Sequence, residues 1–90
     1  MAAFFDPEKD AANWIKHGLP LSFGERIFED DAHLIIPSIR PPDGEERFKI
    51  IGRVDGKLYT AVFAWRDRDP RFISVRRSND GEARAYRTPG

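Results

Sequence analysis

The feature that most constrains this chain is an Asp-Gly pair, Asp55-Gly56, between two runs of alternating apolar and polar residues. Such a pair is the strongest short-range signal for a two-residue β-hairpin of type I′, because both turn residues must adopt positive φ. We therefore predict strands over residues 45–54 and 57–65, with Val54 opposite Lys57. Counting outward from the turn places one set of side chains on an apolar face: Phe48, Ile50, Tyr59, Ala61 and Phe63. The opposite face receives Glu45, Arg47, Lys49 and Arg53.

A helix is expected well before this hairpin. Asp6 is typical of an N-cap, Pro7 suits the first helical position and Gly18 suits the C-cap, so the helix should span residues 7–17. One face recurs at helical spacing, is apolar and is expected to pack on the core: Ala11, Trp14 and Ile15. A second stripe is polar and carries three potential cations: Lys9, Asn13, Lys16 and His17.

Two further strands complete the predicted sheet. Residues 33–39 are rich in strand-forming residues, and Pro37 indicates an edge or bulged strand. Residues 71–77 alternate in polarity after a charged loop over residues 66–70. Two side chains of the last strand are expected in the core, Ile73 and Val75. Two are expected on the opposite face, Ser74 and Arg76.

Two short helices flank these strands in the sequence. Ser22-x-x-Glu25 has the pattern of a capping box and predicts a helix whose inward side chains are Phe23 and Ile27. Asp80 is expected to cap a last helix. The predicted order is two helices, four strands and one helix. This order favours a single α+β domain over residues 1–90 with a mainly antiparallel sheet.

Composition excludes several classes of protein. The chain has no cysteine, so disulfides, thiolate metal sites and thiol nucleophiles are excluded. It has no apolar run long enough to span a membrane, and its first residues lack the features of a secretory signal. A cytoplasmic protein is therefore expected.

The formal net charge of zero hides a division along the chain. Residues 1–45 hold 4 Lys/Arg and 9 Asp/Glu, a net −5, whereas residues 46–90 hold 11 Lys/Arg and 6 Asp/Glu, a net +5. Of the 15 basic residues 11 are arginines, which bind phosphate oxygens in a forked geometry. Charge alone leaves two interpretations open. The second half either faces a polyanion or is neutralised by the first half.

The predicted sheet carries a cationic face made of Arg47, Lys49, Ser74 and Arg76. Forked arginines on such a face can hold a nucleic-acid backbone and stabilise charge that develops at phosphorus. The simpler alternative is a solvated face in which Glu45 pairs with Arg47. Among the aromatic residues, Tyr86 is available for stacking on a base.

His17 is the candidate for proton transfer, because the ordinary pKa of histidine lies near neutrality. The more common role for a lone histidine beside a glycine cap is to stabilise the helix end. A metal site is poorly supported, since His17 and His33 lie in different predicted elements and residues 29–31 lack a recognised ligand spacing. No phosphate-binding loop or nucleophile elbow occurs, and no cofactor is expected.

Three separated motifs keep their spacing along nearly the whole chain. The first is Phe5-Asp6-x-x-Lys9-x-x-x-Asn13-x-x-Lys16-His17-Gly18, followed by Phe23 and Phe28-x-Asp30. The second is Asp43-Gly44-Glu45-Glu46-Arg47-Phe48-x-x-Ile51-Gly52. The third is Ile73-Ser74-Val75-Arg76-Arg77-Ser78 with Glu82 and Tyr86. Together they resemble the BrnT family of toxins from type II toxin–antitoxin systems.

The resemblance implies a RelE-like fold and a metal-independent endoribonuclease that arrests translation. It also implies a BrnA-like antitoxin with a ribbon-helix-helix part, which forms a DNA-binding hetero-oligomer with the toxin and represses the operon. The family's polar positions fall here on Lys9, Asn13, Lys16, His17, Glu45, Arg47, Arg76, Glu82 and Tyr86.

A ribonuclease of this kind uses the 2′-hydroxyl to attack the adjacent phosphorus, and four residues form the predicted catalytic set: His17, Glu45, Arg47 and Arg76. The two arginines would stabilise the equatorial oxygens, His17 would transfer a proton, and Glu45 is an alternative base. Which group acts as base and which as acid stays open. Six further residues are predicted to hold RNA: Lys9, Lys16, Lys49, Ser74, Arg77 and Tyr86.

An alternative is a non-catalytic module that binds nucleic acid or protein. Asn79-Asp80-Gly81 stands where the family usually has basic residues, which fits an inactive relative. The basic face also predicts where an acidic antitoxin segment binds, namely over Arg47, Lys49 and Arg76. Apolar anchors for that segment are expected around Phe4, Phe5 or Tyr86.

Overall fold

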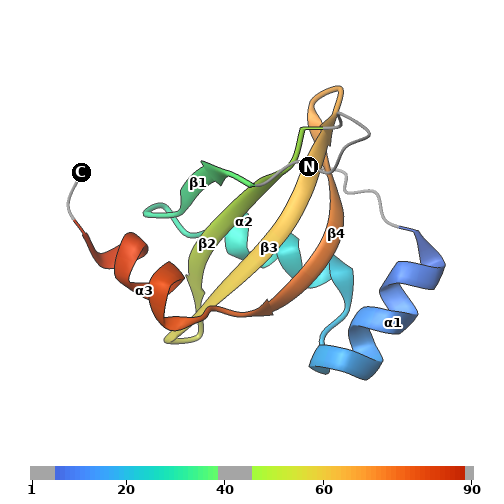
Figure 1. The fold of residues 1–90 in the computed structure, drawn as a ribbon, viewed down its shortest axis with the longest axis horizontal. Coiled ribbons are helices and arrows are strands. Elements are labelled where there is room, and N and C mark those ends of the chain that lie inside the picture. Colours follow the sequence, from blue (N-terminus) through green and yellow to red (C-terminus); the bar gives the residue numbers. More distant parts are fainter. Residues whose placement is uncertain (1–5, 39–45, 89–90) are drawn as a thin grey trace.

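A computed structural model describes residues 6–38 and 46–88 (Figure 1). Its elements in chain order are α1 (Pro7–His17), the 3₁₀ helix η1 (Leu21–Phe23), α2 (Gly24–Phe28), β1 (Leu34–Pro37), β2 (Phe48–Val54), β3 (Lys57–Arg66), β4 (Asp69–Arg77) and α3 (Asp80–Arg87). This order confirms the predicted α+β class. None of the described helices is long and apolar enough to cross a membrane.

The four strands form one antiparallel sheet in the order β1-β2-β3-β4. The predicted hairpin register is confirmed, since Val54 pairs with Lys57. Asp55 and Gly56 both have positive φ, 52° and 80°, as a type I′ turn requires. The strand that contains Pro37 lies at an edge of the sheet, as its proline predicts.

A bulge in β4 changes which of its side chains enter the core. Phe72 pairs with Phe63 and Ser74 pairs with Val62, so Ile73 has no partner on β3. The extra residue interrupts the alternation, and Phe72 is buried while Ile73 stays partly exposed. The prediction that Ile73 faces the core is therefore wrong.

Three other local predictions are also wrong. In place of the expected loop over residues 66–70 there is a two-residue turn, Asp67-Arg68, because β3 extends to Arg66 and β4 begins at Asp69. The last helix is capped by Asn79 in a capping box, not by Asp80. The helix α2 continues directly from η1 and has no side-chain cap, so the capping box predicted over residues 22–25 is absent.

The hydrophobic core lies between the sheet and the η1–α2 segment, which passes behind the sheet in Figure 1. Its buried members are Leu21, Ile27, Ile50, Val54, Ala61, Phe63, Phe72 and Val75. Phe23 of η1 and Tyr59 of β3 pack against this cluster, which confirms the predicted apolar face of the hairpin and the inward positions of Phe23 and Ile27. Gly24 permits the close approach of α2, because a Cβ atom there would overlap the ring of Phe72.

The ends of α1 are as predicted, but its orientation is not. Asp6 caps the helix by accepting a bond from the Glu8 N–H at 2.8 Å, and Gly18 ends it with φ 70°. Trp14 is nevertheless 58% exposed and Ile15 is 85% exposed. The expected apolar stripe, including Ala11, therefore faces outward.

Asn13 explains this orientation. Its side chain is 5% exposed and pairs with the backbone of Val75 at the edge of β4. The amide Nδ2 donates to the Val75 carbonyl at 2.8 Å, and Oδ1 accepts from the Val75 N–H at 3.0 Å. Nδ2 also donates to the Leu19 carbonyl at 2.8 Å. The amide thus satisfies strand groups that would otherwise be left without partners, and it turns part of the polar stripe toward the protein.

Candidate functional site

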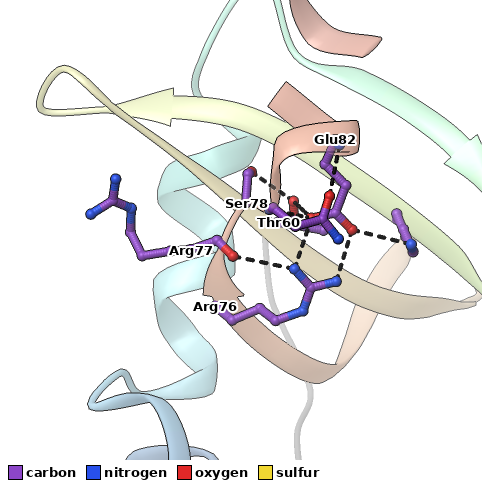
Figure 2. Close-up of polar contacts among 7 residues, drawn as sticks. Thr60, Arg76, Arg77, Ser78 and Glu82 are labelled. Atoms are coloured by element: carbon purple, nitrogen blue, oxygen red, sulfur yellow. Dashed lines mark hydrogen bonds and ion pairs between the residues drawn. The ribbon is translucent and has the colours of Figure 1, made fainter. Parts of the chain in front are cut away.

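Helix α3 places the carboxylate of Glu82 on the sheet face opposite the core (Figure 2). Arg76 holds both of its oxygens, with Nη1 2.7 Å from Oε1 and Nη2 2.8 Å from Oε2. Lys49 Nζ donates to Oε2 at 3.1 Å, while Thr60 Oγ1 and the Asn79 N–H donate to Oε1 at 3.0 Å. We call these five residues the Glu82 cluster. The predicted cations Lys49 and Arg76 therefore lie together, around a carboxylate of the chain itself.

These contacts determine the ionisation of Glu82. Burial alone would raise its pKa, but hydrogen bonds from Arg76, Asn79, Lys49 and Thr60 outweigh that effect and lower the pKa to about 2. The same carboxylate raises the pKa of Arg76 through hydrogen bonding, against the opposing effect of burial. The pair is ionised at neutral pH, and it fixes the guanidinium in one orientation.

A second group of predicted residues meets where α1 crosses β4. A hollow of about 290 Å³ lies there and is lined by Lys9, Ala12, Asn13, Lys16, His17, Ile73 and Ser74. Three residues predicted to hold RNA and one predicted to transfer a proton thus share one surface. Asn13, which belonged to the same predicted stripe, fixes α1 in this position through its bonds to β4.

His17 lines this hollow, and the charge of Arg76 from the Glu82 cluster influences its ionisation. Burial lowers the pKa of His17, and the positive charges of Lys16 and Arg76 lower it further. The imidazole is therefore mainly neutral at pH 7. A neutral imidazole surrounded by cations can accept a proton and can then return it.

Arg47 lies apart from this region. It immediately precedes β2 in the sequence. Its side chain lines a separate hollow of about 310 Å³ with Pro37, Ser38, Glu46 and Phe48. Its Nε atom is buried and finds no hydrogen-bond partner within the described part of the chain. The predicted base Glu45 lies outside the described residues.

Two residues predicted to bind RNA have other partners in the structure. The hydroxyl of Tyr86 donates to Asp30 Oδ2 at 2.6 Å, and this bond, followed by burial, raises the pKa of Tyr86. Arg77 points away from the Glu82 cluster in Figure 2 and lies over the ring of Tyr59, with 5.4 Å between the guanidinium carbon and the ring centroid. Arg76 and Arg77 therefore face opposite sides of the sheet.

A family model described as the ribonuclease toxin, BrnT, of type II toxin–antitoxin systems matches residues 5–82. The chain belongs to the BrnT family. The BrnT family consists of ribonuclease toxins, so an RNA target and an antitoxin partner follow from membership. Tyr86 lies beyond the matched residues. A comparison with curated proteins finds no match.

Some members of the site were not anticipated. Thr60 was overlooked, although hairpin counting places it on the same face as Lys49. Glu82 entered only through the resemblance to the BrnT family. Its contacts join β2, β3, β4 and α3, which are distant from one another in the sequence. A local sequence pattern cannot predict contacts of this kind. Among the described residues, no three metal-ligating side chains come together in a group that could hold a metal ion.

Proposed function

We propose that this chain is a metal-independent endoribonuclease that cleaves RNA in the cytoplasm and thereby arrests translation. Family membership supplies the class of activity. The observation that carries the proposal is His17, whose lowered pKa and cationic surroundings suit proton transfer at a phosphodiester. Lys9, Lys16 and Ser74 line the same hollow and hold the backbone on either side of the cleaved bond.

In the proposed reaction, His17 accepts the proton of a ribose 2′-hydroxyl. The 2′-oxygen then forms a bond to the adjacent phosphorus, and the bond from phosphorus to the 5′-oxygen breaks. The departing 5′-oxygen takes up a proton, either from the protonated His17 or from water while His17 releases its proton to solvent, which leaves a 2′,3′-cyclic phosphate and a 5′-hydroxyl. Glu45 remains an alternative base in this scheme.

Arg76 is proposed to stabilise the charge that develops on the phosphorane oxygens. Within the described residues, three of its N–H groups donate to Glu82 and to the Arg77 carbonyl, and two remain for a phosphate oxygen. Because Glu82 fixes the guanidinium beforehand, little reorganisation is needed in the transition state. Loss of one such donor typically costs about a hundredfold or more in rate.

Arg47 and Lys49 have more peripheral roles in this proposal. Arg47 is separated from Arg76 along the sheet, since the neighbouring Phe48 pairs with Phe63, whereas Arg76 pairs with Thr60. We assign Arg47 to a more distant phosphate of the RNA, and Lys49, which shares the Glu82 carboxylate with Arg76, to the RNA backbone near Arg76. Arg77 and Tyr86 are left out, because they contact Tyr59 and Asp30 respectively.

Cleavage of a defined RNA in the presence of EDTA tests the proposal. We expect discrete fragments with 2′,3′-cyclic phosphate ends, and no cleavage where a single 2′-deoxy nucleotide replaces the attacking ribose. His17→Gln should abolish cleavage, while His33→Gln should not, because His33 contacts the Asp30 carbonyl away from the hollow. RNA binding without cleavage by the unmodified protein would favour the alternative, a non-catalytic binding module.

For the partner, we propose a BrnA-like antitoxin with a ribbon-helix-helix part. The toxin and antitoxin would form a hetero-oligomer that binds operator DNA. Co-expression with the protein encoded beside the toxin gene, followed by an electrophoretic mobility assay on the promoter DNA, tests this assignment. A complex that neutralises the toxin but does not bind DNA would refute the ribbon-helix-helix part of the proposal.

A further inference from the structure

The outward side of α1 exposes large apolar side chains that the fold does not use. Ile15 is 85% exposed and Trp14 is 58% exposed, and Ala11 next to them is also exposed. The three lie at helical spacing, so they form one continuous stripe. We call this stripe the α1 apolar face. An exposed apolar group of this kind on a small protein is typical of an interaction surface.

The other tryptophan of the chain provides a contrast. Trp65 is 45% exposed, but its ring packs edge-on against Phe63 and Phe28, with centroid distances of 5.1 and 6.1 Å. Trp65 is therefore partly exposed because one side of its ring packs against the aromatic residues of the core and the other side faces solvent. Trp14 has no such ring contact among the described residues, and its helix is held to β4 by the amide of Asn13. Within the described residues, Trp14 is not among the side chains that pack on the core cluster.

Charge next to the α1 apolar face indicates what kind of partner covers it. Lys9 and Lys16 lie on the same helix and line the adjoining hollow, and one exposed carboxylate, that of Glu8, lies beside the stripe in the first turn. Ala12, which is exposed, lies between them and the apolar stripe. A complementary surface therefore needs apolar side chains opposite Trp14 and Ile15, with carboxylates along one side.

We propose that the antitoxin docks on the α1 apolar face, through a segment whose apolar side chains cover Trp14 and Ile15 and whose carboxylates pair with Lys9 and Lys16. This inference rests on the proposed function for the identity of the partner. The same segment covers the lysines that are proposed to hold RNA, so docking excludes the substrate directly. The sheet face with Lys49 and Arg76 attracts an acidic partner less strongly, since the Glu82 carboxylate already offsets part of the charge of both cations.

Two matched pairs of substitutions test the docking surface. Trp14→Ala is compared with Trp65→Ala, and Ile15→Thr with Ile35→Thr, a second exposed isoleucine on the edge strand. The probe is the protein encoded beside the toxin gene, and the measurement is its affinity by isothermal titration calorimetry. Trp14→Ala should weaken binding on the order of thirtyfold, the size expected for a central aromatic anchor. The two control variants should bind as the unmodified toxin does.

Circular dichroism of each variant verifies folding, and RNA cleavage is measured separately. Unchanged affinity in both Trp14→Ala and Ile15→Thr overturns the inference while leaving the proposed ribonuclease intact. Absence of cleavage by the unmodified toxin refutes the proposed function, and the binding comparison then still decides the docking surface. A toxin that is dimeric alone, and that Trp14→Ala converts to a monomer, would assign the face to a second copy and overturn the inference.

Discussion

Replacing Glu82 by glutamine tests whether the Glu82 cluster stabilises the fold through ionisation. Glutamine keeps the size of the side chain and an oxygen that can accept from the Asn79 N–H, so the capping box survives. It removes the negative charge that Arg76 and Lys49 share. Because the carboxylate is 5% exposed while the side chains of Lys49 and Arg76 are about a quarter to a third exposed, water compensates for its loss only in part.

The magnitude follows from the pKa of Glu82. Folding lowers this pKa from 4.5 to about 2. The shift corresponds to about 3 kcal/mol of stability at pH 7. A depressed carboxylate pKa stabilises the folded state above the unfolded pKa, and the contribution is lost as the pH falls toward the folded pKa. The wild type should therefore exceed Glu82→Gln in stability by about 3 kcal/mol at pH 7, and by only about 1 kcal/mol at pH 3.

Urea unfolding of both proteins at pH 7 and pH 3 provides the measurement. The difference between the two proteins isolates Glu82, since every other carboxylate titrates in both. Glu29→Gln is the control, because Glu29 is exposed and should change stability by less than about 0.5 kcal/mol. If the gap between the wild type and Glu82→Gln is the same at both pH values, Glu82 is not held as an ionised partner and the reasoning fails.

Three further predictions concern other parts of the structure. Asn13→Ala removes two hydrogen bonds to the edge of β4 and one to the Leu19 carbonyl, and it should cost about 3 kcal/mol, which calorimetry would record as a melting temperature more than about 10 °C lower. Lys16→Met should raise the pKa of His17 toward its ordinary value, as followed by NMR titration of the imidazole, and should shift the acidic limb of the cleavage profile to higher pH. Gly24→Ala should destabilise the protein by about 1–3 kcal/mol, because the added methyl group overlaps the ring of Phe72; chemical denaturation measures this.

Local signals predicted the parts of the fold whose geometry is fixed by neighbouring residues. Asp55-Gly56 determines a turn, and the turn determines the pairing of β2 with β3, so the register could be counted directly. Asp6 and Gly18 likewise satisfy backbone groups at the ends of α1 and mark its bounds. In each case the decisive contact lies within a few residues of the signal.

Long-range contacts account for what was missed. The prediction that the apolar stripe of α1 faces the core assumes that burial of apolar side chains determines the orientation of the helix. The amide of Asn13 instead satisfies the unpaired edge of β4, 62 residues away in the sequence. The bulge at Ile73 depends on how β4 pairs with β3, which no alternation within β4 alone reveals. The carboxylate of Glu82, on α3, similarly pairs with cations from two strands, β2 and β4.

The orientation of α1 has a consequence for how the toxin is neutralised. Its inward side is fixed by hydrogen bonds, from Asn13 to β4 and from the Leu21 N–H to Asp10 at 2.7 Å. These bonds hold the helix through Asn13 and Asp10. The apolar residues and the lysines of α1 are therefore both available to contact a partner. On the α3 side an antitoxin carboxylate would meet the negative charge of Glu82, which already pairs with Arg76 and Lys49. Docking on α1 avoids this repulsion and leaves the Glu82 cluster unchanged.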